Sequence, residues 1–211
     1  MRGMETSLRI ENPWPNASVF VKERTESTME DARALAELGC VSGTTVVAGS
    51  QSKGRGRVPG RLWVSPPWES LLATIVLRRV DVSFPPTELP LRAAVAVARA
   101  IEDASGIPIR VKRPNDLLFE GKKLSGILCE ARGDSLLIGI GVNCMQCAFP
   151  RDIESSACSI LQACGREVRV FDLLALVLGR MREVLSDPSW RDQLVRRLEP
   201  GPSEADLRTD R

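Results

Sequence analysis

The segment from residue 88 to residue 105 limits what this chain can fold into more than any other. Six small apolar residues stand in a row near its centre, from Ala93 to Ala98, and Gly106 follows its end. This pattern predicts a helix over residues 88–105 that ends at the glycine. A helix that is apolar nearly all round packs against a sheet rather than lying on the surface. The rest of the chain must therefore supply strands.

Seven short apolar runs predict those strands. They span residues 18–23, 44–48, 70–77, 109–112, 117–119, 124–130 and 136–142. Glycine-containing turns at residues 120–122 and 132–134 connect the last three as hairpins. The expected fold class is therefore α+β, with a mixed, largely antiparallel sheet flanked by helices.

Three further helices are predicted. A capping box, Ser27-Thr28-Met29-Glu30, opens the first helix, and Gly39 ends it. The other two cover residues 156–163 and 171–185. After Pro188 the chain ends in a polar segment, from Glu199 onward, which we expect to be loosely ordered because it offers too few apolar residues to pack.

Composition and length exclude several classes of protein. With 211 residues, 43% of them hydrophobic, the chain is long enough for one well-buried core. The formal net charge is only +2, whereas a dedicated nucleic-acid-binding protein usually has a larger basic excess. No run of about 18 apolar residues is present, which predicts no transmembrane helix, and the first residues do not resemble a signal peptide. We therefore expect a cytoplasmic protein.

Histidine and cysteine content narrow the chemistry further. Because the chain has no histidine, it has no Ser-His or Cys-His nucleophile and no histidine metal ligand. The last four of its six cysteines are irregularly spaced for a metal site, and we predict none. We expect the cysteines to be reduced residues of the core; they are Cys40, Cys129, Cys144, Cys147, Cys158 and Cys164.

A basic, glycine-rich loop at residues 50–65 indicates an anionic ligand. No carboxylate occurs between Leu38 and Trp68, and glycine lets the backbone approach a ligand closely. Trp63, at the exit of the loop, could stack on a base. The cations are Lys53, Arg55, Arg57 and Arg61, and the glycines between them are Gly54, Gly56 and Gly60. Taken alone, the loop could also track single-stranded nucleic acid or be a solvated linker.

Two further motifs have ordinary interpretations when each is taken singly. Residues 111–116 read Val-Lys-Arg-Pro-Asn-Asp, in which asparagine and aspartate after proline are typical of a turn. Residues 122–128 place two lysines before an apolar strand, which is typical of a solvated hairpin. Their occurrence beside the basic loop in one small domain favours a functional site.

Together these motifs make the chain resemble the biotin–protein ligase family. Five signatures occur in the family's order: residues 27–29 (Ser-Thr-Met), 51–57 with 60–63 (Gln-Ser-Lys-Gly-Arg-Gly-Arg and Gly-Arg-Leu-Trp), 112–116, 123–128 (Lys-Leu-Ser-Gly-Ile-Leu) and 139–143 (Gly-Ile-Gly-Val-Asn). The resemblance covers about residues 18–187 and implies a single catalytic domain over residues 1–211. We expect neither an N-terminal DNA-binding domain nor the small β-barrel domain that usually follows the catalytic domain.

The resemblance implies a two-step reaction with ATP. The biotin carboxylate attacks the α-phosphate and forms biotinyl-5'-AMP, and a lysine of a biotin carboxyl carrier protein or carboxylase subunit then accepts the biotin. Mg²⁺ is expected to accompany the ATP. No DNA or membrane partner is implied, and a homodimer is left open.

The resemblance also implies roles for individual residues. Those expected around biotin are Ser27, Thr28, Met29, Gln51, Arg55, Gly56, Arg57, Lys123 and Gly126. Those expected around ATP and the adenylate are Arg55, Arg57, Arg61, Trp63, Lys112, Asn115 and Asn143. The catalytic set is Arg57, Lys112, Asp116 and Lys123, with Asp116 orienting or deprotonating the incoming lysine.

Three positions depart from the family pattern. Met29 stands where the family usually has asparagine, Pro59 lengthens the basic loop by one residue, and Arg113 replaces a tryptophan. Two alternatives remain beside biotin ligation. One is a lipoate or octanoate ligase or transferase of the same fold, and the other is a catalytically weak ligand-binding module.

Overall fold

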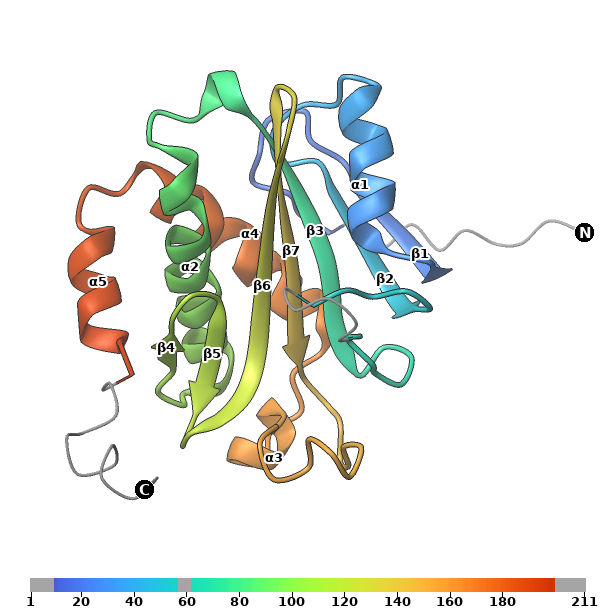
Figure 1. Cartoon of the computed structure of the whole chain (residues 1–211), viewed down its shortest axis with the longest axis vertical. Coiled ribbons are helices and arrows are strands. Elements are labelled where there is room, and N and C mark those ends of the chain that lie inside the picture. Colours follow the sequence, from blue (N-terminus) through green and yellow to red (C-terminus); the bar gives the residue numbers. More distant parts are fainter. Residues whose placement is uncertain (1–9, 57–61, 200–211) are drawn as a thin grey trace, which may run out of the picture.

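The computed structural model describes residues 10–56 and 62–199, and these form a seven-stranded sheet with helices on both faces (Figure 1). The strand order is β1-β2-β3-β7-β6-β5-β4. Only β1 and β2 pair in parallel; every other neighbouring pair is antiparallel. The strands are β1 (Val19–Thr25), β2 (Thr45–Gln51), β3 (Ser70–Arg78), β4 (Arg110–Lys112), β5 (Asp116–Phe119), β6 (Lys122–Arg132) and β7 (Ser135–Asn143). The predicted α+β class with a mixed, largely antiparallel sheet is confirmed.

The central strands are buried on both faces because helices cover each side. Helix α1 (Thr28–Glu37) lies on one face, and α2 (Leu89–Ser105) packs with α4 (Val170–Ser186) on the other (Figure 1). Successive residues of β3 show the alternation that results. Ile75 belongs to the larger core with α2 and α4, and Val76 belongs to the smaller core under α1. The apolar segment that predicted α2 is accordingly buried from Ala93 to Ala98.

The predicted capping box at the start of α1 is wrong. The Ser27 side chain makes no capping hydrogen bond. The backbone N–H of Thr28 donates instead to Oε1 of Gln51 at 2.7 Å. The Glu30 carboxylate, which a capping box would turn back to the backbone, pairs with Arg33 and Arg55. Tertiary partners have therefore taken over the groups that a local cap would use.

A capping box does occur at the third helix, which is shorter than predicted. Helix α3 covers only Ile160–Cys164, whereas the sequence predicted residues 156–163. The Ser159 hydroxyl accepts from the backbone N–H of Gln162, whose side-chain oxygen accepts from the N–H of Ser159. Ala157, two residues before Ser159, forms an isolated bridge with Lys123, so the chain there is extended.

Helix α5 (Trp190–Arg197) was not predicted. Its first residue, Trp190, is only 2% exposed and anchors it to the core. The centre of the Trp190 ring lies 4.6 Å from the guanidinium carbon of Arg92. Phe84 lies 4.1 Å from the same guanidinium, and cations over aromatic rings are attracted to them. The backbone N–H of Glu199 then donates to Val111 at the sheet edge, while residues 200–211 lie outside the described part of the chain.

All six cysteines are free thiols. Burial raises the pKa of Cys129 and of Cys144 to about 12 and that of Cys158 to about 11. Cys147 is exposed, so its expected place in the core is wrong. Within residues 10–56 and 62–199, no helix has the length and hydropathy to cross a membrane, and no cluster of three metal-ligating side chains is found.

Candidate functional site

Two neighbouring cavities open beside the carboxyl-terminal half of β7, where the basic loop crosses the sheet. The smaller has a volume of about 60 Å³ and the larger about 320 Å³. Four residues line both cavities, namely Gly56, Trp63, Asn115 and Lys123. These shared walls make the two cavities parts of one site.

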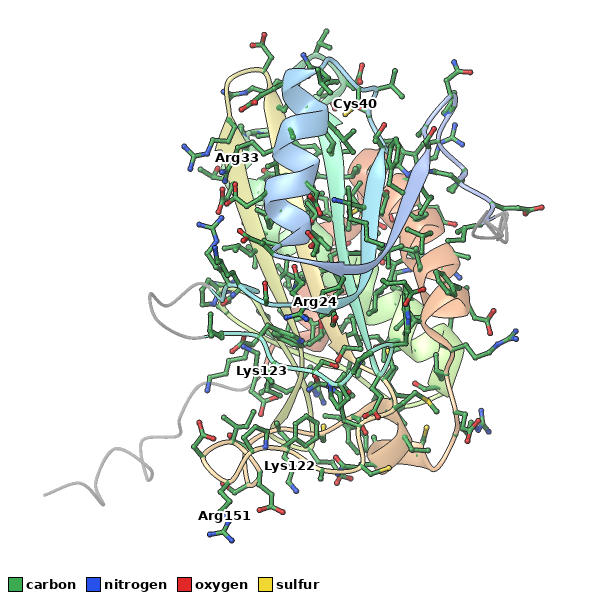
Figure 2. All side chains as sticks on the ribbon, turned by 90° about the vertical axis from the view of Figure 1, so that its right-hand side faces the viewer. Arg24, Arg33, Cys40, Lys122, Lys123 and Arg151 are labelled. Atoms are coloured by element: carbon green, nitrogen blue, oxygen red, sulfur yellow. The ribbon has the colours of Figure 1, made fainter. Side chains whose placement is uncertain are left out.

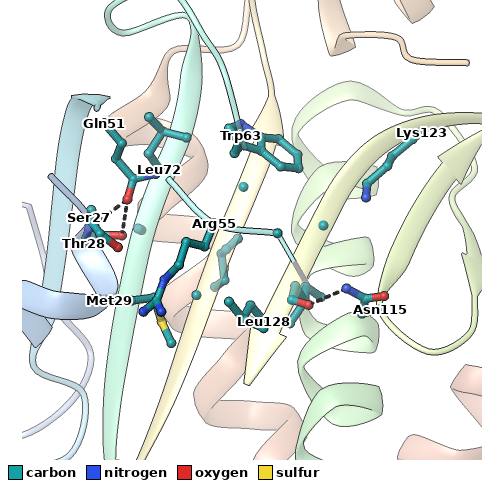
Figure 3. A pocket seen from close by; sticks show the side chains of 17 residues that line it. Ser27, Thr28, Met29, Gln51, Arg55, Trp63, Leu72, Asn115, Lys123 and Leu128 are labelled. Atoms are coloured by element: carbon teal, nitrogen blue, oxygen red, sulfur yellow. Dashed lines mark hydrogen bonds between the residues drawn. The ribbon is translucent and has the colours of Figure 1, made fainter. Parts of the chain in front are cut away.

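The structure brings together around the smaller cavity nearly all the residues that the sequence assigned to biotin (Figure 3). Arg57 and Arg61 lie outside the described residues. The assigned residues that line this cavity are Ser27, Thr28, Met29, Gln51, Arg55, Gly56, Lys123 and Gly126. They come from the start of α1, the end of β2, the basic loop and β6.

A chain of hydrogen bonds fixes the polar end of the smaller cavity. The hydroxyl of Thr74, on β3, donates to Oγ1 of Thr28 at 2.9 Å. The Thr28 hydroxyl and N–H both donate to Oε1 of Gln51, at 3.1 and 2.7 Å. Because Oε1 is used within the protein, the amide NH₂ of Gln51 is the end that remains for a ligand. Thr74 is fully buried, and sequence reasoning missed it.

We expect Thr74→Val to weaken binding at this polar end without touching the ligand. Valine has a similar shape but cannot donate, so Thr28 loses the bond that orients its hydroxyl. A lost neutral hydrogen bond contributes about 1 kcal/mol, which corresponds to roughly fivefold weaker binding. Isothermal titration of the full chain with biotin would measure this. An affinity within twofold of the parent would contradict a role for Thr74.

Three glycines leave room for the cavity floor and for Trp63. A Cβ atom added at Gly141 would lie 2.8 Å from the Trp63 ring, and one at Gly126 would lie 3.0 Å from it. At Gly139, the added atom would lie 2.9 Å from Sδ of Met29. Gly139 and Gly141 belong to one of the family's motifs, but nothing in that motif alone predicted that they line the cavity.

Met29 is part of the hydrophobic core as well as the cavity. Its side chain is 5% exposed and packs with the small cluster under α1. An asparagine at this position would meet the same apolar neighbours. The departure from the family pattern therefore gives this wall an apolar surface and fills the space above Gly139.

Lys123 stands between the two cavities and is paired with Asp116. Its Nζ lies 2.6 Å from Oδ1 of Asp116 and 5.9 Å from the centre of the Trp63 ring. Both side chains are partly exposed, at 39% and 29%. Lys122, the preceding residue, is exposed, and its side chain is separate from that of Lys123 (Figure 2). The strand alternation therefore selects one lysine of the pair for the site.

The sequence-assigned residues of the nucleotide side are only partly brought together. Trp63, Asn115 and Asn143 line the larger cavity, whereas Lys112 is exposed on β4 and lines neither cavity. The Asn143 amide is held at both ends: it donates to the Cys158 carbonyl at 3.0 Å and accepts from Gln146 at 3.1 Å. The bonds to the protein orient this amide beside the cavity.

The far wall of the larger cavity was missed by sequence reasoning. It comes from the loop that follows β7 and from the exit of the basic loop. Its apolar members are Leu62, Val64, Phe149, Ile153 and Ala157. Phe149 and Ile153 are the two large apolar residues of segment 149–156, whose other members are proline or polar, and this was the one signal that could have indicated them.

Comparison with known proteins identifies the family of this site. The model of the biotin/lipoate A/B protein ligase family matches residues 21–145, which is more than half of the chain. The chain belongs to this family. It is 40% identical over 150 residues to the bifunctional ligase/repressor BirA of Bacillus subtilis, a match that covers 67% of this chain and 46% of that protein. The biotin–[acetyl-CoA-carboxylase] ligase of Mycobacterium tuberculosis is 33% identical over 146 residues, covering 67% and 54%.

Solved structures of the family have the same fold. The biotin protein ligase from Aquifex aeolicus in complex with biotin and ATP superposes with a TM-score of 0.76 at 31% identity, covering 86% of this chain and 78% of that one. The biotin protein ligase from Leishmania major in complex with biotinyl-5-AMP gives a TM-score of 0.77 at 25% identity, covering 88% and 83%. The chain spans about half the length of the curated relatives it matches.

Proposed function

We propose that this chain is the catalytic part of a biotin protein ligase, which forms biotinyl-5'-AMP from biotin and ATP and transfers biotin to a carrier lysine. The observation that carries the proposal is the paired cavity with Lys123 between its halves. The smaller half is polar at the Thr28–Gln51 end and apolar along Met29 and the glycine floor, which suits a compact bicyclic head with a polar ureido edge. Relatives with complexes of biotin, ATP and biotinyl-5-AMP support the assignment.

In the first step, the biotin carboxylate attacks the α-phosphate of ATP, a new P–O bond forms, and pyrophosphate leaves. Two anionic groups must approach each other, so a fixed cation at their meeting point lowers the barrier. Lys123 lines both cavities, which supports the proposal that it contacts the activated carboxyl oxygen. Arg57 and Arg61 of the basic loop, which lie outside the described residues, are proposed to add positive charge for the same step.

In the second step, the ε-amine of the carrier lysine attacks the acyl carbon of the adenylate, an amide forms, and AMP leaves. The incoming ammonium must first lose a proton. Asp116, which lines the larger cavity, is the carboxylate proposed to orient or deprotonate it. In the unliganded protein Asp116 is ion-paired with Lys123, so the approach of the adenylate to Lys123 would release it for this task.

The larger cavity is proposed for the nucleotide. Trp63 offers an aromatic face, and Asn115 and Asn143 offer amides beside it. Lys112 would have to reach the phosphates from the exposed face of β4. Mg²⁺ is expected to be held mainly by the phosphates of ATP, because the residues described offer no dedicated set of carboxylate ligands.

The test is transfer onto a purified biotin carboxyl carrier domain. We expect the full chain, with ATP, Mg²⁺ and biotin, to produce a carrier that avidin detects, and a carrier whose acceptor lysine is replaced by arginine to stay unlabelled. Parallel reactions with lipoate and octanoate, read by mass, test the first alternative. Transfer of either in preference to biotin would replace the proposal, and biotin binding without any transfer would support a catalytically weak module instead.

A further inference from the structure

Arg55 belongs to a square of four alternating charges at the rim of the smaller cavity. Nη2 of Arg55 lies 2.6 Å from Oε1 of Glu30 and 3.9 Å from Oε1 of Glu130. Arg33 takes the other carboxylate oxygens: it contacts Oε2 of Glu30, and its Nη2 lies 3.0 Å from Oε2 of Glu130. Each glutamate therefore offers one oxygen to each arginine. We call these four residues the charge square.

The inner half of the charge square is more protected than the outer half. The side chains of Arg33 and Glu130 are 23% and 20% exposed, whereas those of Arg55 and Glu30 are 46% and 45% exposed. Arg33 holds the two glutamates together, although they would repel each other without it. The pair of carboxylates is thus a preformed seat for Arg55. A single exposed ion pair contributes little, but a network with partly buried members contributes more.

The charge square joins three elements around the cavity. Arg55 comes from the basic loop, Glu30 from the first turn of α1, and Glu130 from β6. Met29 and Leu128, which precede the two glutamates by one and two residues, line the cavity together with Arg55. Figure 3 shows the Arg55 side chain extending from the loop toward Met29. The ion pairs therefore tie the loop to both α1 and β6.

We infer that Glu30 and Glu130 are positioning residues that hold Arg55 across the rim of the cavity and so slow the dissociation of bound biotin. The inference rests on the proposed function. The ureido head of biotin carries no charge and does not compete for the guanidinium, so the ion pairs persist when the head is seated. Dissociation then requires the loop to leave its seat on the two glutamates.

The test compares dissociation rates of radiolabelled biotin from the full chain, chased with unlabelled biotin. We expect Glu30→Gln, Glu130→Gln and Arg55→Gln to release biotin about three to ten times faster, the effect of losing one partly exposed member of a charge network. Glu26→Gln is the matched control. Glu26 pairs with Lys53 of the same loop at 3.0 Å, but that pair is two-thirds exposed and lines neither cavity. This control should keep the parental rate.

Two further measurements separate positioning from a merely structural effect. The double variant of Glu30 and Arg55 should release biotin no faster than the faster single variant, because both changes break the same link. Added salt should speed release from the parent and have less effect on Glu30→Gln.

Arg55→Gln alters an exposed side chain, so it stays informative if a glutamate variant has a lowered thermal midpoint. Parental rates in Glu30→Gln and Arg55→Gln, or equal acceleration in Glu26→Gln, would overturn the inference. A parent that binds no biotin would overturn the proposed function itself.

Discussion

Lys123→Ala is expected to reduce biotin-dependent release of pyrophosphate by about 10²–10³-fold, the usual effect of removing one fixed donor from a charged transition state. The ammonium of Lys123 lies where the two cavities meet, so alanine leaves the approaching carboxylate and phosphate without that cation. The protein should remain folded, because the side chain is 39% exposed and its partner Asp116 is also partly exposed. Pyrophosphate release and the thermal midpoint are measured together.

Lys122→Ala provides the internal control for this prediction. Lys122 has the same charge and is adjacent in the sequence, but it is exposed and lines neither cavity (Figure 2). Its activity should stay within about twofold of the parent, as for most surface substitutions. Equal activities in the two variants would defeat the assignment of Lys123. So would a loss in Lys123→Ala that is explained by a fallen thermal midpoint.

Gly141→Ala is expected to weaken biotin binding by about 10–100-fold, since overpacking of a fitted wall costs about 1–3 kcal/mol. The new Cβ would lie within 2.9 Å of three atoms of the Trp63 indole, which is a rigid ring. Either Trp63 shifts into the space that both cavities share, or β7 moves. Titration calorimetry with biotin measures the loss, and circular dichroism reports whether the fold persists.

Gly139→Ala is the comparison for that variant. Gly139 lies two residues earlier on the same strand and lines the same cavity. The atoms nearest its added Cβ belong to Met29, whose flexible side chain can rotate away. We expect a smaller loss than for Gly141→Ala. If Gly139→Ala were as damaging, added volume anywhere in the floor, and not the fixed place of Trp63, would explain the effect.

The strands and the buried helix α2 followed from local pattern, and the expected members of the smaller cavity followed from the resemblance to the family's motifs. The apolar run from Ala93 to Ala98 has one stable environment, under a sheet, and the structure places it there. The motif residues Gln51, Lys123 and Gly126 could be assigned to one cavity before their elements were located, because the motifs of the family carry contacts as well as fold. Both inferences use information held within a few consecutive residues.

Tertiary structure decided how those residues are oriented and which partners they have. Glu30 is a capping residue by local pattern, but Arg33 and Arg55 claim its carboxylate. Thr74 is one buried strand residue among many until its hydroxyl meets Thr28, 46 residues away in the sequence. Helix α5 depends on the contact of Trp190 with Arg92. A charged group or hydroxyl bonds to whichever partner the fold brings within hydrogen-bonding distance. That distance cannot be read from the separation of the two residues along the sequence.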